Sequence, residues 1–268
     1  MLFKDVLIGS DPELFIYDQN KSQVISSIGL IPGEKGNAFK PEGYAPGYGL
    51  QIDNILGEFN IPPTNVKEEF INSILTMKQY IIDFVKRINP NYTILCKASE
   101  LINPDQLQSE EAKLFGCSPD FNVWTLSQNP RPQGDITNLR TTGCHIHIGY
   151  DSPTVEKSIA LVRVLDLFLG IPSLFIDKDV RRRSLYGKAG SFRFTTYGVE
   201  YRVLSGYFIN HPILIEWMFN NTMAAIEFLQ DDNNLCILTP QLETIINTND
   251  LNQAYQYIQN YNINMPNI

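Results

Sequence analysis

The chain is poor in the residues that build zinc sites and disulfide frameworks. Its 268 residues include four cysteines, none of them spaced as CxxC, and three histidines. Sparse cysteine without regular spacing predicts buried free thiols in a reducing compartment rather than a structural zinc site. The histidines are His145, His147 and His211, and a metal centre built from histidine alone is therefore disfavoured.

Positive charge is also scarce. Lysine and arginine number 21 against 29 aspartate and glutamate, which gives a net charge of −8 and a pI near 4.9. A protein that coats nucleic acid is disfavoured, because the phosphate backbone attracts basic surfaces. Several of the acids fall in short clusters, which divalent cations can neutralise.

Long apolar stretches are missing. No run of 18 or more apolar residues occurs, and the first residues, MLFKDVLIGSDPELF, carry acids where a signal peptide is apolar. We therefore expect a soluble, cytoplasmic protein that does not bind membranes. The composition, 43% hydrophobic and 19% charged, predicts a folded core. We expect a single domain over residues 1–268, with a weakly ordered Asn/Gln-rich tail over 247–268.

The remaining patterns predict three long helices and several short strands. One helix is expected from Asn65, as its N-cap, to Ile88, with Glu68 completing the cap. A second is expected to start at Ser152–Pro153 and a third near Asn210. Strands are expected over 6–17, in TTGCHIHIG and in VEYRVLS, and residues 18–50 as hairpins or a long loop over a site. Because helices do not regularly separate the strands, a mixed or antiparallel α+β sheet is favoured.

Strand alternation places pairs of titratable side chains on common faces. Three such pairs are Asp11 and Glu13, His145 and His147, and Glu200 and Arg202. In QIDNILGEFN, Asp53 and Glu58 are five residues apart, so a bend or bulge is needed to bring them together. A face this polar must meet water, pair internally, or hold cations and an anionic ligand.

Residues 181–193, RRRSLYGKAGSFR, concentrate positive charge around two glycines in an otherwise acidic chain. The segment is either a solvated basic loop or a phosphate-binding loop of guanidinium forks and backbone N–H groups. It is not a P-loop, because GKAG lacks the GxxxxGK[ST] frame.

Carboxylates together with arginines are the residue types that nucleotide-dependent phosphoryl transfer needs, since Mg²⁺ bridges carboxylate and phosphate oxygens. Zinc hydrolases also use HxH, but the one further histidine, His211, stands at a predicted helix start. A metal-dependent hydrolase is therefore the weaker alternative.

The ordered set GSDPELF, DNILGEFN, GCHIHIG, RRRSLYGKAGSFR and YGVEYRVLS resembles the phage-type carboxylate–amine ligase (amidoligase, COOH-NH2 ligase type 2) family. That family is a branch of the glutamine synthetase and glutamate–cysteine ligase superfamily. The resemblance spans roughly residues 7–210. GCSPDFNVW, residues 116–124, resembles a further signature of the branch, with no role that its chemistry assigns.

The resemblance implies a glutamine synthetase-like fold, a curved, mostly antiparallel sheet shaped as a funnel or half-barrel with helices on its outer face. It implies that a carboxylate attacks the γ-phosphate of ATP, giving an acyl phosphate that an amine converts to an amide. It also implies Mg²⁺ or Mn²⁺ as cofactors, small-molecule or peptide substrates, and the cytoplasm of a phage-infected or prophage-bearing bacterium.

The resemblance also implies a role for each matching residue. The implied metal ligands are Asp11, Glu13, Asp53, Glu58, His145 and Glu200. The implied nucleotide-binding residues are His147, Arg181, Arg182, Arg193 and, more weakly, Lys188. Arg202 is the implied clamp on substrate or transferring phosphate, and the implied catalytic set is Glu13, Glu58, Glu200 and Arg202. Asp11 departs from the ExE pattern of the family, which together with the tail leaves a second reading: a catalytically degenerate phage structural or interaction protein on the same scaffold.

Overall fold

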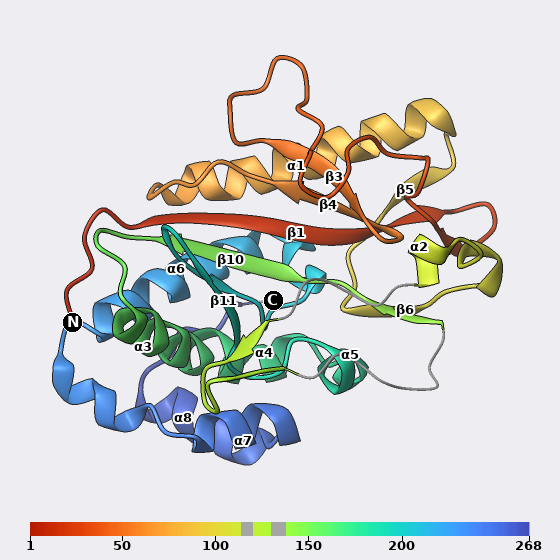
Figure 1. Cartoon of the computed structure of the whole chain (residues 1–268). Coiled ribbons are helices and arrows are strands. Elements are labelled where there is room, and N and C mark those ends of the chain that lie inside the picture. The colour runs from red at the N-terminus through yellow and green to blue at the C-terminus, as the bar shows by residue number, and fades with distance from the viewer. Residues whose placement is uncertain (114–119, 130–137, 268) are drawn as a thin grey trace.

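The computed structural model describes residues 1–113, 120–129 and 138–267 (Figure 1). Ten strands of this part form one open sheet: β1 (Leu7–Asp18), β2 (Gln23–Ile25), β3 (Gly49–Asp53), β4 (Leu56–Asn60), β5 (Tyr92–Leu95), β7 (Phe121–Asn122), β8 (Ser127–Gln128), β10 (Cys144–Gly149), β11 (Ser191–Thr195) and β12 (Gly198–Tyr201). Their order is β3-β4-β1-β10-β12-β11-β7-β8, with β2 and β5 also paired to β1. The short strands β6 (Ser99–Leu101) and β9 (Leu139–Thr141) pair separately.

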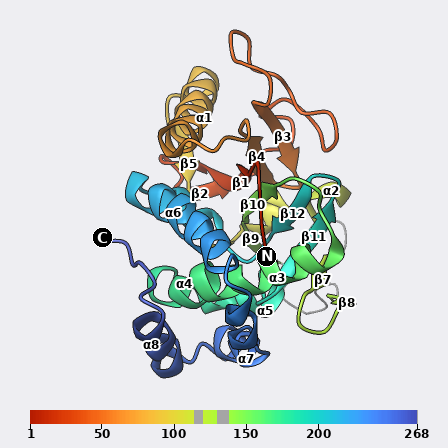
Figure 2. The same cartoon turned by 90° about the vertical axis from the view of Figure 1, so that its left-hand side faces the viewer.

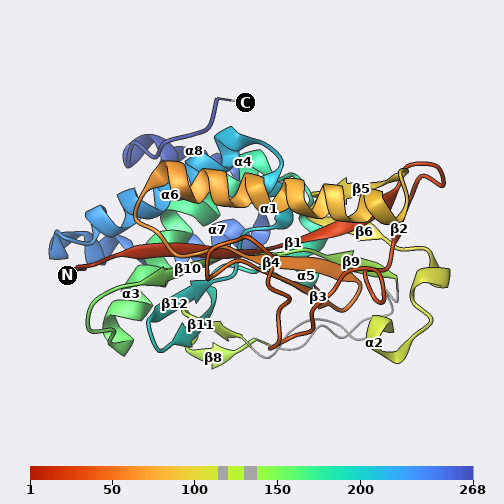
Figure 3. The same ribbon diagram turned by 90° about the horizontal axis from the view of Figure 1, so that it is seen from above.

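The helices lie mainly on one side of this sheet. They are α1 (Lys67–Ile88), α2 (Glu110–Lys113), α3 (Val155–Leu165), α4 (Ile171–Ile176), α5 (Val180–Leu185), α6 (Pro212–Phe228), α7 (Gln241–Thr248) and α8 (Leu251–Asn260). Figure 2 shows the strands as an arc from β3 to β8, with α1, α6 and α4 outside it. Seen from above, α1 and α6 again lie on one side and β3 and β11 on the other (Figure 3). The expected α+β class with a curved, mostly antiparallel sheet is confirmed, and the sheet is open (Figure 2).

The apolar stripe of α1 forms part of the core, as its helical spacing predicts. Phe70, Ile74 and Met77 are fully buried, and α1 packs against α6 and β5. The two ends of the stripe, Val66 and Ile88, are exposed. The buried face therefore covers the middle of the helix, where α6 crosses it.

The predicted helix caps are each displaced along the chain. Asn65 does not cap α1; the helix follows Val66, and the backbone N–H of Val66 donates to the hydroxyl oxygen of Thr64. At α3 the cap is Thr154, whose hydroxyl oxygen accepts from Lys157 N, rather than Ser152. Side-chain capping depends on local backbone geometry that a Ser, Thr or Asn near a helix start does not specify.

The run Val155–Ile176 is continuous, because a π-helical turn, Asp166–Gly170, joins α3 to α4. By length and composition it is the one described helix apolar enough to cross a membrane, with a mean hydropathy of 2.1. Its apolar window is 78% buried inside the fold. This is the arrangement of a core helix in a soluble-type fold.

The C-terminal residues contribute a helix of their own. α8 packs against α4 and α7, and it buries Ala254 and Ile258. The weak order expected of residues 247–268, and the single-domain organisation, stay predictions.

Candidate functional site

Strand register collects the acidic and histidine side chains on one face of the sheet. Three cross-strand pairs lie directly opposite each other: Asp11 with His145, His147 with Glu200, and Glu13 with Glu58. Directly opposed residues of antiparallel strands share a face. The paired side chains of β4, β1, β10 and β12 therefore form a single polar surface across four neighbouring strands.

Asp53 joins this surface through a hairpin rather than through the bend or bulge that the sequence suggested. β3 and β4 are antiparallel, and the two-residue turn Asn54–Ile55 connects Asp53 to Leu56. Asn54 has a φ of +55°, which short polar residues such as asparagine tolerate. The turn folds Glu58 back toward the strand that carries Asp53.

Two groups of three potential ligands result. In each group the ligand atoms all lie within 4.8 Å of one another. The groups are Asp11, His147 and Glu200, and Glu13, Asp53 and Glu58. All five carboxylate residues are at most 9% exposed. Buried carboxylates at this density need either compensating cations or protonation.

The group at Glu13 and Glu58 is electrostatically unfavourable by itself. Burial, with the nearby charges of Asp11, Glu13 and Asp53, raises the pKa of Glu58 well above its ordinary value. Burial likewise raises the pKa of Glu13, although His145 and the Gly143 N–H, which donates to Glu13 Oε2, act against it. Without a further cation these carboxylates are held partly in their protonated forms.

In the group at Asp11 and Glu200, the pKa of each carboxyl is lowered instead of raised. Burial acts to raise the pKa of Asp11, but the charges of His147 and His145 hold it well below its ordinary value. Burial also opposes ionisation of Glu200, yet His145 and Arg202 lower the pKa of that carboxyl. These two acids are therefore ionised and available as ligands.

Each histidine turns one ring nitrogen toward these acids. His147 Nε2 lies 3.1 Å from Asp11 Oδ1, while His145 Nδ1 lies 3.1 Å from the same oxygen and 3.4 Å from Glu200 Oε1. The family resemblance implied a metal-facing role for His145 and a phosphate-facing role for His147. The geometry favours a metal-facing role for His147 as well, since its Nε2 is the nitrogen in the three-ligand group.

Arg202 is a buried cation at the end of β12, beside Glu200. It is 1% exposed and forms an ion pair with Glu200. Its Nε lies 3.7 Å from Asp120 Oδ2, and it donates to the Tyr186 hydroxyl. Arg193, opposite Glu200 on β11, reaches that carboxylate at 3.5 Å.

Two residues at Arg202 escaped sequence reasoning. Tyr186 lies inside the arginine-rich segment, whose charge pattern gives a tyrosine no role. Asp120 belongs to the GCSPDFNVW signature, which gave a signal without a role; residues 116–119 of that signature lie outside the described part of the chain. The contact with Arg202 gives the signature a connection to the site.

Arg182 occupies a different place from the phosphate-facing one expected of it. Its guanidinium is buried and donates to the carbonyl oxygens of Thr142, Val203 and Leu204. A side chain at Gly187 would collide with this guanidinium, at 1.9 Å from its Nη1. Arg182 therefore ties α5 to the strands beneath the site.

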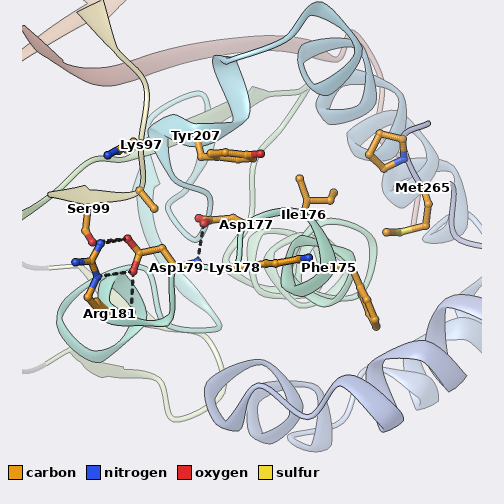
Figure 4. Close-up of a pocket in the computed structure, with 12 residues that line it drawn as sticks. Lys97, Ser99, Phe175, Ile176, Asp177, Lys178, Asp179, Arg181, Tyr207 and Met265 are labelled. Carbon is orange, nitrogen blue, oxygen red and sulfur yellow. Dashed lines mark hydrogen bonds and ion pairs between the residues drawn. The ribbon is translucent and has the colours of Figure 1, made fainter. Parts of the chain in front are cut away.

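Arg181 points away from the acidic face, into a separate cavity of about 770 Å³ (Figure 4). There it makes a double hydrogen bond with Asp179, whose other donor is Ser99. Lys188 lies in the turn before β11, and no ion pair among the described residues links it to the acids. Of the predicted phosphate set, the structure brings His147 and Arg193 to the face and places Arg181 and Arg182 elsewhere.

A second cavity, of about 720 Å³, adjoins the acidic face at His147 and Tyr197. Its floor includes Gly9 and Gly149, each one alternation step from Asp11 and His147 on the same face. A methyl group at either glycine would meet only ordinary contacts, at 3.6 Å or more. Neither glycine has a left-handed backbone, so the fold itself does not require them, and glycine within a strand also marks close approach of a ligand.

These features define a class: an α+β protein whose curved antiparallel sheet carries a carboxylate-rich candidate metal site beside buried arginines. Residues 137–258 match the family model described as phage phiEco32-like COOH.NH2 ligase-type 2. The resemblance to phage-type carboxylate–amine ligases is thereby confirmed over this segment, a little under half of the chain. The match includes both site histidines, the arginine-rich segment, Glu200 and Arg202, but begins after the acids of β1, β3 and β4. A comparison with curated proteins found no match.

Proposed function

We propose that the protein is an ATP-dependent carboxylate–amine ligase. A substrate carboxylate oxygen attacks the γ-phosphorus and ADP leaves, giving an acyl phosphate. An amine then attacks the acyl carbon, loses a proton, and expels phosphate as the amide forms. The family match supports the ligase class, and the observation that carries the proposal is the pair of three-ligand groups beside Arg202.

The residues fit divalent cations on two grounds. Asp11 Oδ1 and His147 Nε2 are buried atoms that, although close, are not aligned for a hydrogen bond. The second group contains only carboxylates, with Lys35 at 3.5 Å from Asp53 and half exposed. Oxygen-rich sets with a histidine suit Mg²⁺ or Mn²⁺ better than zinc. When bound, such ions would be held by these two groups of side chains and would neutralise charge during phosphoryl transfer.

The chain's own residues supply orientation and charge. Arg202, held by Glu200, Asp120 and Tyr186, fixes a positive charge beside the two groups of potential ligands, where it can offset negative charge on a bound carboxylate or phosphate. Arg193 adds a second positive charge at the edge of β11. The cavity over Gly9 and Gly149 offers space for the organic part of the nucleotide next to His147.

We further propose that the substrates are small molecules or peptides, one contributing the carboxylate and the other the amine. We place the reaction in the cytoplasm of a phage-infected or prophage-bearing bacterium; the phage-type family match supports the host, and burial of the apolar helix inside the fold agrees with a location away from membranes.

The proposal predicts turnover that needs both nucleotide and metal. Purified protein incubated with ATP, Mg²⁺ and pooled amino acids or peptides should release ADP and phosphate and produce a new amide detectable by mass spectrometry. Arg202→Lys should reduce turnover sharply, because a point charge does not replace a planar fork. Arg181→Lys is the matched control and should leave turnover unchanged.

Other outcomes would point to the alternatives. Failure to bind nucleotide at millimolar ATP with metal would reject the ligase, and tight association with a phage structural protein would then favour the degenerate scaffold. Metal-dependent turnover without nucleotide would indicate a hydrolase.

A further inference from the structure

Each histidine of GCHIHIG is bound by a tyrosine at the ring nitrogen that faces away from the acids. The Tyr197 hydroxyl lies 2.6 Å from His147 Nδ1, and His147 Nε2 faces Asp11. At His145 the two ring nitrogens have the opposite roles. The Tyr186 hydroxyl lies 3.2 Å from His145 Nε2, while Nδ1 faces the acids.

Tyr197 is held by the turn between β11 and β12. The next residue, Gly198, has a φ of +150°, and a side chain there would come within 2.1 Å of the Ile148 carbonyl oxygen. The Tyr197 carbonyl oxygen accepts from Tyr150 N at 3.0 Å. The turn is therefore fixed to β10 at the residues that follow His147.

Tyr186 is held by two arginines. Its ring lies 5.3 Å from the Arg182 guanidinium and 5.4 Å from that of Arg202, distances at which cations attract aromatic faces. His145 has little freedom to turn, since a methyl group on Gly143 would lie 2.3 Å from its Nε2. The ring and its tyrosine are thus fixed from both sides.

We propose that Tyr186 and Tyr197 are positioning residues that select which nitrogen each histidine offers to the metal site. This inference rests on the proposed function. A neutral imidazole has one N–H and one lone pair, and a hydrogen bond that retains the proton on one nitrogen leaves the lone pair on the other. Tyr197 accepts from His147 Nδ1–H and leaves Nε2 as the ligand. Tyr186 accepts from His145 Nε2–H and leaves Nδ1 toward Asp11 and Glu200.

Such outer hydrogen bonds have a measurable effect on metal affinity. Losing one weakens metal binding by roughly 10–100-fold. We expect Tyr197→Phe, which retains the ring and removes only the hydroxyl, to weaken Mn²⁺ binding by about that factor. Tyr186→Phe should act in the same direction. Tyr255→Phe is the control, because Tyr255 is 57% exposed on α8, and it should bind Mn²⁺ as the unmodified protein does.

The measurement is the fraction of free Mn²⁺, followed by electron paramagnetic resonance during titration of the full chain. Double-mutant cycles make it specific: Tyr197→Phe should have no further effect in a His147→Ala background, nor Tyr186→Phe in His145→Ala. Mn²⁺ binding that is equal in the tyrosine variants and the unmodified protein would overturn the inference alone. An unmodified protein that binds no Mn²⁺ would overturn the proposed function and the inference together.

Histidine ring nitrogen spectra of ¹⁵N-histidine-labelled, metal-free protein give a second readout. Tyr197→Phe should shift the Nδ1 resonance of His147 and leave that of His145 in place, whereas Tyr186→Phe should shift Nε2 of His145. If a single tyrosine substitution shifted the ring nitrogen resonances of both histidines, the cause would be a general loosening of the fold. That result would contradict the assignment of one tyrosine to each histidine. Thermal unfolding by circular dichroism verifies that each variant folds.

Discussion

At the scale of single residues, Glu58 carries the clearest conflict between stability and function. Its carboxyl lies among Asp11, Glu13 and Asp53, and burial with these charges raises its pKa. Glu58→Gln removes a titratable carboxyl from this group of acids and so reduces their mutual repulsion. The variant should therefore have a higher Tm than the unmodified protein in the absence of metal at pH 7. The same variant should lose Mn²⁺ affinity by on the order of 100-fold, at least as much as loss of an outer-shell hydrogen bond.

Differential scanning fluorimetry in EDTA and Mn²⁺ titration measure the two effects. Glu42→Gln, at an exposed glutamate, is the matched control and should change neither quantity. A lower Tm for Glu58→Gln in EDTA would contradict the view that the acids repel one another in the metal-free protein.

Arg182 and Arg181 are neighbours in the chain, but Arg182 is buried in the core and Arg181 is half exposed, so their substitutions should affect stability differently. Arg182 donates to three backbone carbonyls in the core, and lysine cannot reproduce this fork. Arg182→Lys should lower the free energy of unfolding by about 2–4 kcal/mol, since a buried hydrogen bond to a charged group contributes about 1.5–3 kcal/mol. Arg181→Lys should cost less than about 1 kcal/mol, as exposed ion pairs do. Urea unfolding of both variants makes the comparison, and equal losses would contradict it.

At the scale of elements, the sequence predicts which side chains share a face but not which strands pair. Alternation alone puts Asp11 with Glu13 and His145 with His147. The pairing of Asp11 with His145 depends on the register of β1 against β10, which tertiary packing decides. Asp53 and Glu58 show the limit: strand alternation predicted a bend or bulge between them, and the chain makes a hairpin at Asn54.

The arginine-rich segment shows a second limit. Charge pattern suggested a phosphate loop, yet Arg182 faces the core and Arg181 a separate cavity, because α5 places adjacent residues in different directions. In an α-helix, each side chain is rotated by about 100° around the helix axis from the one before it. Residue type therefore predicts a kind of site, whereas strand register and helix geometry decide which side chains reach it.

The π-helical turn between α3 and α4 carries a buried acid that should control stability with pH. Burial raises the pKa of Asp166 to about 7, against hydrogen bonds from Trp124, Gly190 and Tyr201. The native state thus retains a proton that the unfolded chain loses near pH 3.8. For this group, stability falls by on the order of 4 kcal/mol as the pH rises from about 4 to 7, and it does not change further above pH 7.

Asp166→Asn isolates this contribution, because an amide has the shape of the protonated acid. Urea unfolding between pH 4.5 and 8 should show a smaller loss of stability in the variant than in the unmodified protein. Glu13 and Glu58 add a dependence of the same sign, and it remains in both proteins. Parallel curves would show that Asp166 is ionised throughout.

At the scale of the whole molecule, the pairing of four strands brings together acidic and basic side chains from residues 11 to 202. The resemblance rests on the order of these segments along the chain, and the antiparallel arrangement β4-β1-β10-β12 explains why they converge. Five buried carboxylates lie near few positively charged side chains, so part of their negative charge is not compensated in the metal-free protein. Binding of divalent ions to the native state alone should supply it.

We therefore expect Mg²⁺ or Mn²⁺ to stabilise the entire fold. At 100 times the dissociation constant, ligand binding contributes about 2.7 kcal/mol, which corresponds to a rise in Tm of roughly 5–10 °C for a chain of this size. The rise should be larger at pH 8 than at pH 6, because the raised pKa of Glu13 and of Glu58 makes protons compete with metal as the pH falls. EDTA should reverse it, Glu58→Gln should diminish it, and Glu42→Gln should retain it. An equal Tm with and without metal at pH 8 would show that the acids on this face balance their charge by protonation and not by cations.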